Sequence, residues 1–277
     1  MGQPTYDLAT ADHDYPLWIG PPARHILICT HPRSGSTLLG EALHFAGGLG
    51  CPLEYFHVGF RPSFAQRWCA PDIGSYTKAV RRHRTDPGGV MSVKLFWRDI
   101  EELAQEIDPV RFPAAAFLTP HQMDEEIYRQ LAALLTMLFP NMALVHLFRR
   151  DRVRQAVSAV VATSTGQWRD LQGAQNGPVA PLTAFDSEKI ERMIGYSDHC
   201  NGHWRNLFNA LGRAPHDITY EALVGDYAQS IASLLRALGS DAAPSPARMH
   251  KQADVQSEAM VLRYLRERAV PTPVVNA

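Results

Sequence analysis

The chain has 277 residues, of which 45% are hydrophobic and 20% charged, and its formal net charge is −1. These proportions are ordinary for a globular protein, and a chain of this length can fold without disulfide bonds or metal ions. A near-neutral charge argues against nucleic acid as the main partner, because nucleic-acid binding needs a basic surface. The cysteines form no C-x-x-C pair, so the sequence predicts neither a zinc site nor a disulfide framework.

Residues 1–23 predict an irregular N-terminal arm that ends at Gly20-Pro21-Pro22. The arm has neither the basic start nor the apolar run of a secretion signal. Elsewhere no stretch approaches the roughly 18 apolar residues of a membrane span. We therefore expect a cytoplasmic protein in which one domain, residues 24–277, follows the arm.

Short apolar runs bounded by turn residues predict buried strands at residues 25–30, 90–96, 143–148 and 217–220. Apolar residues recur with a helical period over residues 37–45, 127–139, 153–161, 187–211 and 228–238. Short buried strands that alternate with helices are typical of a parallel sheet covered on both faces. The sequence predicts an α/β fold: a single-domain parallel sheet flanked by helices.

The loop after the first predicted strand carries the most informative pattern in the sequence. Pro32 is followed by Arg33, Ser34, Gly35, Ser36 and Thr37, and a helix begins at once. Backbone N–H groups converge at a helix N-terminus, where the helix dipole also favours an anion. Gly35 lets the backbone approach a ligand closely, and the arginine and hydroxyl side chains add donors. The loop predicts a phosphate-type anion site; the alternative is a simple serine or threonine N-cap.

Several other loop motifs are excluded by what this segment lacks. The first glycine and the lysine of a Walker A loop are missing, which argues against a metal-dependent kinase or nucleoside triphosphatase. Neither G-x-G-x-x-G nor the G-x-S-x-G motif of serine hydrolases is present. The Cys-x5-Arg spacing of thiol phosphatases fails because Gly35 occupies the arginine position.

The loop resembles the 5′-phosphosulfate loop of sulfotransferases that use 3′-phosphoadenosine-5′-phosphosulfate (PAPS). Further segments recur in the same order in the bacterial Stf0-type (trehalose 2-sulfotransferase-like) family: Pro52-Leu53-Glu54-Tyr55-Phe56, Val93-Lys94-Leu95-Phe96-Trp97, Phe148-Arg149-Arg150-Asp151, Gln155-Ala156-Val157-Ser158 and Lys251-Gln252-Ala253-Asp254. The chain is similar to that family over about residues 25–268. The resemblance implies a P-loop-like sulfotransferase fold, PAPS as donor with 3′,5′-ADP as product, no metal, and a homodimer.

Two basic residues at predicted strand ends point to anion contacts from their position alone. Ligands of open α/β sheets bind beyond the carboxyl ends of the strands, where Arg149 would meet a second phosphate. Its alternative is a solvated cationic helix start shared with Arg150, Arg152 and Arg154. Lys94 lies near the end of a buried strand, where its charge needs an anion unless the side chain reaches solvent. We expect Lys94 to contact the transferred group or the acceptor.

The resemblance assigns roles to the remaining candidates. Arg149 and Ser158 would bind the 3′-phosphate of the donor, and Lys251 would make a further donor contact. Glu54 matches the catalytic glutamate of the family and would accept the proton of the acceptor hydroxyl, with His57 as the alternative base. The alternative for Glu54 is a glutamate in a surface loop. Arg33 and the loop amides would stabilise charge on the transferring group.

Two departures from the family pattern lie beside Glu54. The trehalose enzymes carry an acidic residue three positions earlier and a glutamine three positions later, where this chain has Cys51 and His57. Both positions would face the acceptor, and buried partners of sugar hydroxyls decide specificity. The sequence therefore predicts sulfuryl transfer to a carbohydrate or glycolipid hydroxyl and leaves trehalose open as the acceptor. The alternative is a catalytically inactive nucleotide-binding protein of the same fold.

Overall fold

The computed structural model describes residues 6–166, 168, 185–249 and 255–269. The chain forms two compact units. The larger unit contains Tyr6–Arg150 and Asp198–Arg248, and the smaller one contains Met1–Thr5, Asp151–Ser197 and Met249–Ala277. Among the described residues, no helix has the length and apolar character needed to cross a membrane.

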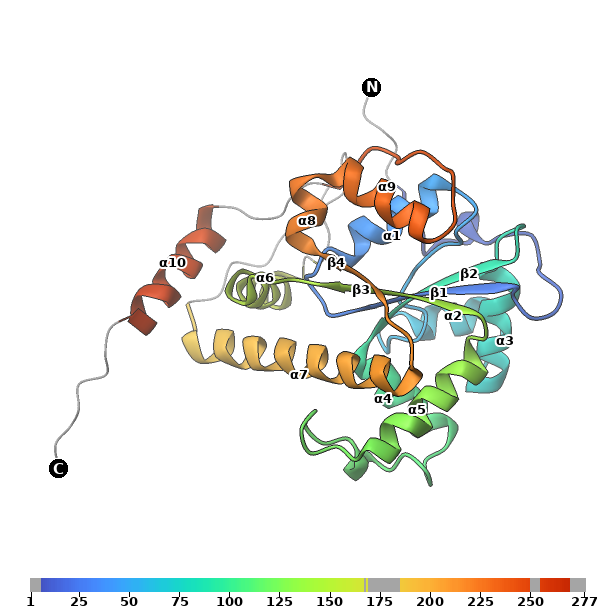
Figure 1. Cartoon of the computed structure of the whole chain (residues 1–277), viewed down its shortest axis with the longest axis horizontal. Helices are drawn as coiled ribbons and strands as arrows, with labels where there is room; N and C mark the ends of the chain where they lie inside the picture. Colours follow the sequence, from blue (N-terminus) through green and yellow to red (C-terminus); the bar gives the residue numbers. More distant parts are fainter. Residues whose placement is uncertain (1–5, 167, 169–184, 250–254, 270–277) are drawn as a thin grey trace. The chain divides into compact units, whose positions relative to one another are not determined.

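The larger unit is built on a parallel sheet with the strand order β2-β1-β3-β4 (Figure 1). Its strands are β1 (Arg24–Thr30), β2 (Val90–Phe96), β3 (Met142–Phe148) and β4 (His216–Thr219). In register, Thr30 of β1 pairs with Phe96 of β2 and with Leu147 of β3. The carboxyl ends of the strands therefore share one edge, where an open α/β sheet binds its ligands.

Helices connect the strands and cover the sheet. They are α1 (Ser36–Ala46), α2 (Arg61–Arg67), α3 (Ile73–Arg84), α4 (Trp97–Ile107), α5 (Glu125–Leu138), α6 (Arg152–Thr165), α7 (Ser187–Leu211), α8 (Tyr220–Gly225), α9 (Tyr227–Ala237) and α10 (Val255–Ala269), with short 3-10 turns η1 (Ala11–His13) and η2 (Ala114–Ala116).

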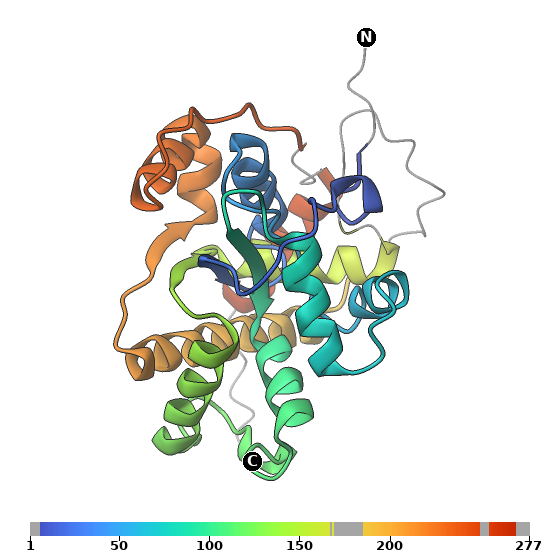
Figure 2. The same cartoon turned by 90° about the vertical axis from the view of Figure 1, so that its right-hand side faces the viewer.

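Alternating side chains of the strands divide the core of the larger unit into two clusters. Leu27 of β1 packs with buried residues of α3, α4, α5 and the second half of α7, whereas Ile26 and Ile28 pack with α1, α8 and α9. Figure 2 shows α1 and α9 on one side of the sheet and α4 and α5 on the other. Both faces of the sheet are thus buried, which is why its strands read as continuous apolar runs.

The smaller unit has a core of its own, built from α6, α10 and the first half of α7. Val157 and Val160 of α6 pack with Ile190 of α7 and with Val261 of α10. On its surface, Arg154 forms ion pairs with Asp151 and with Glu258. Arg154, one of the arginines of the predicted cationic helix start, is thus paired with acidic residues.

The N-terminal arm wraps around a buried arginine of the larger unit. Arg84 of α3 donates hydrogen bonds to the carbonyl oxygens of Leu8 at 2.9 Å and Thr10 at 3.2 Å. Its guanidinium also forms an ion pair with Asp14 at 2.8 Å. Since a buried charge is tolerated only when it is paired and hydrogen-bonded, these contacts fix the arm without regular strands or helices.

The α/β fold predicted from the sequence is confirmed, and so are the four strands and the helices that became α1, α5, α6, α7 and α9. The fourth strand ends at Thr219, because Tyr220, which the pattern included in it, begins α8. The pattern missed α2, α3, α4, α8 and α10. In α3 the cause is composition, since basic residues fill its last turn and few apolar ones mark its buried face.

Candidate active site at the carboxyl edge of the sheet

The loop between β1 and α1 has a backbone that only a few residue types tolerate. Arg33 adopts a φ of 64° and Gly35 a φ of 84°, both in the left-handed region. At Gly35 a side chain is excluded for a second reason, because an added Cβ would lie 2.8 Å from Cδ2 of Tyr220. Left-handed backbone at a non-glycine residue costs about 1 kcal/mol or more and is retained at ligand-binding turns.

The loop carries several hydrogen-bond donors at the edge of the sheet. Ser34 and Ser36 are buried and Thr37 is half-buried, and the first turn of an α-helix offers N–H groups without intrahelical acceptors. The strand end before the loop is fixed from the other side, where the indole N–H of Trp204 donates to the Thr30 carbonyl at 3.1 Å. The predicted anion-binding loop thus has a rigid base and a set of donors at its tip.

Arg149, at the end of β3, lies beside this loop. One of its Nη atoms is 3.5 Å from the Arg33 carbonyl oxygen, and its guanidinium stacks on the ring of Tyr220 at 4.4 Å. Burial lowers the pKa of the Arg33 guanidinium, and the like charge of Arg149 lowers it further. The charge of Arg149 thus acts on Arg33, and an anion beside the two side chains would reduce their repulsion.

A second charged group of the site is the ion pair of Lys94 and Glu54, whose Nζ and Oε1 atoms lie 2.8 Å apart. The Lys94 side chain is 2% exposed and the Glu54 side chain 12%. Strand alternation turns Lys94 away from Val93 and towards α1, where its Cδ passes 3.7 Å from a Cβ built on Gly40. A parallel bridge between Leu53 and Val93 brings Glu54 alongside.

This ion pair compensates the charge of Lys94 and uses only one of the two carboxylate oxygens of Glu54. Among the described residues, no hydrogen bond reaches the other carboxylate oxygen of Glu54, Oε2. The sequence predicted that Lys94 needs an anion, and the anion that it meets in the structure is Glu54. The two residues therefore belong to one cluster.

The neighbours of Glu54 differ in accessibility. His57 is half-buried, donates its backbone N–H to the Glu54 carbonyl at 3.1 Å, and stands edge-on to the ring of Phe96. Cys51 is fully buried, and its Sγ lies 3.6 Å from a guanidinium nitrogen of Arg84. The ring of His57 is thus partly exposed and its Nδ1 accepts from the Gly59 N–H at 3.1 Å, while the thiol of Cys51 faces the core.

A further carboxyl group, which the sequence patterns did not single out, belongs to this cluster. Asp99 of α4 is buried, and its Oδ2 accepts a hydrogen bond from the Phe96 N–H at 2.8 Å. No described residue hydrogen-bonds its buried Oδ1. Burial raises the pKa of Asp99 to about 8, and the charge of Glu54 contributes to the rise against the effect of the Phe96 hydrogen bond. Asp99 is thus a neutral acid at pH 7.

Two predicted site residues are not in the described part of the larger unit. Ser158 is half-buried on α6 of the smaller unit. Lys251 lies outside the described residues. Their roles stay predictions.

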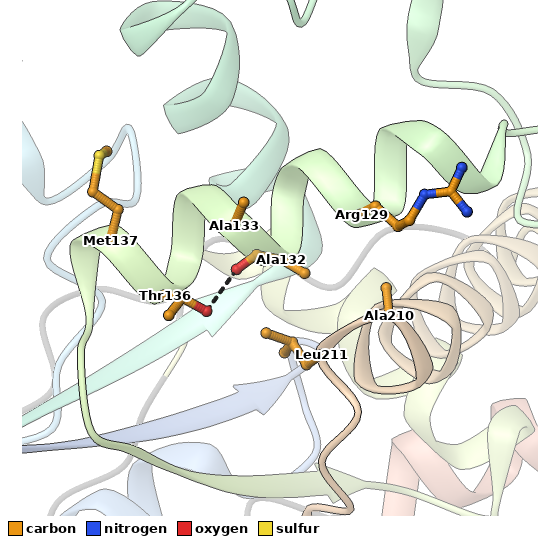
Figure 3. Close-up of a pocket in the computed structure, with 7 residues that line it drawn as sticks. All are labelled: Arg129, Ala132, Ala133, Thr136, Met137, Ala210 and Leu211. Carbon is orange, nitrogen blue, oxygen red and sulfur yellow. Dashed lines mark hydrogen bonds between the residues drawn. The ribbon is translucent and has the colours of Figure 1, made fainter.

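An open pocket elsewhere in the larger unit has no such chemistry (Figure 3). It lies between α5 and the end of α7 and is lined mainly by small and apolar residues. Its one charged side chain, Arg129, forms an ion pair with Glu126 at 2.8 Å. Met137 and Leu211 of its lining precede β3 and β4 in the chain, so they lie towards the amino ends of these strands.

Comparison with known proteins identifies a matching family. The sequence profile of the Stf0 sulphotransferase family matches residues 25–267. A trehalose 2-sulfotransferase of Mycobacterium tuberculosis (strain ATCC 35801 / TMC 107 / Erdman) is 30% identical over 270 residues, which cover 88% of this chain and 95% of that protein. A trehalose 2-sulfotransferase of Mycolicibacterium smegmatis (strain ATCC 700084 / mc(2)155) is 28% identical over 271 residues, covering 87% and 94%.

The raised pKa of Asp99 predicts a pH dependence of stability. The folded protein holds this proton up to about pH 8, whereas an unfolded chain releases it near pH 4. Between these values the group makes the free energy of unfolding fall as pH rises, by at most about 1.4 kcal/mol per pH unit. Asp99→Asn keeps the acceptor for Phe96 and removes the titration, so its stability relative to wild type should increase from pH 5 to pH 8.

Urea unfolding of both proteins at the two pH values measures this difference. Asp124→Asn is the matched control, because Asp124 caps α5 from an exposed position and its side chain accepts from the Glu126 N–H. If the stability of Asp99→Asn relative to wild type were the same at both pH values, the neutral state of Asp99 would be wrong.

Proposed function

Since the chain belongs to the Stf0 sulphotransferase family and is therefore a sulfotransferase, we propose that it transfers a sulfuryl group from PAPS to a hydroxyl of a carbohydrate or glycolipid. The observation on which the proposal depends is the close approach of Arg33 and Arg149 at the loop after β1. The acceptor class is supported by the two relatives, both of which are trehalose 2-sulfotransferases.

The larger unit offers the donor two anion positions. The loop amides, Arg33 and the hydroxyl groups of Ser36 and Thr37 suit a 5′-phosphosulfate, and Arg149 suits the 3′-phosphate. The proposal is supported by Tyr220, whose ring lies against Gly35 of the loop and under the guanidinium of Arg149 and so places the two cationic positions near each other. Ser158 and Lys251 remain proposed as further contacts to the donor.

When bound, PAPS supplies the sulfuryl group for in-line displacement and leaves as 3′,5′-ADP. Glu54 is proposed to act as the general base, with Oε1 held by Lys94 and Oε2 open to the acceptor hydroxyl, whose proton it takes. Lys94 has further N–H donors for the transferred group or the acceptor. Arg33 and the loop amides stabilise the negative charge that develops on the leaving phosphate. These steps need no metal ion.

The acceptor is proposed to lie against Glu54 and His57. His57 is half-buried beside Phe96 and shares a turn with Glu54, so its ring can contact a sugar or replace Glu54 as the base. Cys51 offers little to an acceptor, because its thiol is buried against Arg84. The acceptor is thus recognised by a set of groups different from the acidic residue and glutamine of the trehalose enzymes. The homodimer and the cytoplasmic location stay predictions, as does the division into arm and single domain.

Removing one guanidinium should weaken binding of the donor product. We expect Arg149→Ala to raise the Kd for 3′,5′-ADP by about 10–100-fold, because hydrogen bonds to charged groups contribute about 1.5–3 kcal/mol. A thermal-shift titration with 3′,5′-ADP measures the change, since a ligand stabilises the folded state in proportion to its occupancy.

Arg150→Ala is the control for this experiment, because it removes the same charge from the next residue, whose side chain is exposed. Its Kd should remain near that of wild type. Equal Kd values for the two variants would remove Arg149 from the donor site.

Replacing the proposed base should separate binding from transfer. Glu54→Gln should bind 3′,5′-ADP as wild type does and lose about 10²–10⁴-fold in the rate of transfer, the usual share of a positioned base. The assay follows labelled sulfate from PAPS onto a panel of carbohydrates that includes trehalose.

Glu126→Gln, an exposed change on α5, controls for the loss of a carboxylate. An active Glu54→Gln enzyme would exclude Glu54 as the base and make His57 the next residue to test. A wild-type protein that binds 3′,5′-ADP but transfers sulfate to no carbohydrate would favour the inactive nucleotide-binding alternative.

A further inference from the structure

Three side chains of types that bind metals meet between α4 and α7, and the proposed reaction uses none of them. Glu101 comes from α4, and His199 and His203 come from α7. The histidines are four residues apart and so share one face of the helix, with ring centroids 4.4 Å apart. One ligand atom from each of the three residues lies within 4.8 Å of the other two.

One ring nitrogen of His203 has a hydrogen-bond partner, and the other has none among the described residues. The ring is fully buried and stacks on Trp97 at 4.3 Å, and its Nδ1 lies 2.7 Å from the hydroxyl of Tyr128. The Tyr128 oxygen accepts from the Asn206 amide at 3.0 Å and has a second lone pair for a proton on Nδ1. In that tautomer Nε2 carries a lone pair.

This lone pair has no hydrogen-bond donor in the described part of the chain, where Nε2 of His203 is buried and unsatisfied. An acceptor buried in this way loses its hydration without compensation. A neutral imidazole binds a metal ion through the ring nitrogen that carries the lone pair, which in this tautomer is Nε2.

Glu101 is held in a comparable way. Its Oε1 accepts a hydrogen bond from the indole N–H of Trp97 at 2.5 Å, which fixes the carboxylate and leaves its second oxygen for another partner. Hydrogen bonds that orient the ligands, here from Trp97 and Tyr128, are the usual surroundings of a metal site.

We propose that Glu101, His199 and His203 bind a divalent transition-metal ion, with Zn²⁺ as the best match. Two imidazoles and one carboxylate form a donor set that zinc takes in proteins, with a further position for water. Mg²⁺ and Ca²⁺ fit poorly, because they prefer oxygen ligands throughout. The ion connects α4 to α7, and the site is independent of sulfuryl transfer at Glu54.

Metal-free, untagged full-length protein tests the proposal. Isothermal titration with ZnCl₂ should give one tight site, and ZnCl₂ should raise the melting temperature where MgCl₂ does not. His199→Ala and Glu101→Gln should each weaken Zn²⁺ binding by about 100-fold or more, since even residues behind the ligands contribute 10–100-fold. The visible spectrum of the Co²⁺ form should indicate nitrogen and oxygen ligands without sulfur.

His121→Ala, an exposed histidine outside the cluster, is the matched control and should bind Zn²⁺ as wild type does. Circular dichroism checks folding, and if His199→Ala does not fold, Glu101→Gln decides, because its side chain keeps the shape and the acceptor for Trp97. The site is excluded if ZnCl₂ neither binds nor stabilises the protein. It is equally excluded if the folded variants keep wild-type affinity, which would indicate adventitious binding at surface histidines or cysteines.

Discussion

The repulsion between Arg33 and Arg149 is the constraint around which the site is organised. Like charges separate unless the fold holds them, and here the ends of adjacent parallel strands bring them to one edge of the sheet. The ring of Tyr220 stacks on Arg149 and also lies against Gly35 of the loop that carries Arg33. The proposed anionic ligand would reduce this repulsion.

Lys94, Glu54 and Asp99 form a second group of ionisable side chains in the site. Lys94 and Glu54 neutralise each other, and Asp99 stays protonated because it is buried near Glu54. The cluster thereby holds a protonated carboxyl group beside the ion pair of Glu54 and Lys94, which is compatible with the proposed role of Glu54 as the base. Gly40 of α1 leaves room for the segment before Glu54, because an added Cβ would lie 3.0 Å from the Pro52 carbonyl oxygen.

Much of the fold was predictable because it depends on short-range patterns. The strands follow from apolar runs, and the loop between β1 and α1 follows from the turn residues between a strand pattern and a helix pattern. The pairing of Lys94 with Glu54 was not, because it requires strand alternation together with a bridge between distant segments. In the sequence, nothing distinguishes Asp99 from any other acidic residue in the first turn of a helix. The four-residue spacing of His199 and His203 was visible, but only the fold brings Glu101 to it.

The most direct test of the two-anion site compares three nucleotides by isothermal titration calorimetry on the wild-type protein. One molecule of 3′,5′-ADP should bind per chain, at least about tenfold more tightly than 5′-AMP or 3′-AMP, because each monophosphate leaves one cationic position without its partner. Equal affinities for the three nucleotides, or no heat with any of them, would contradict the account.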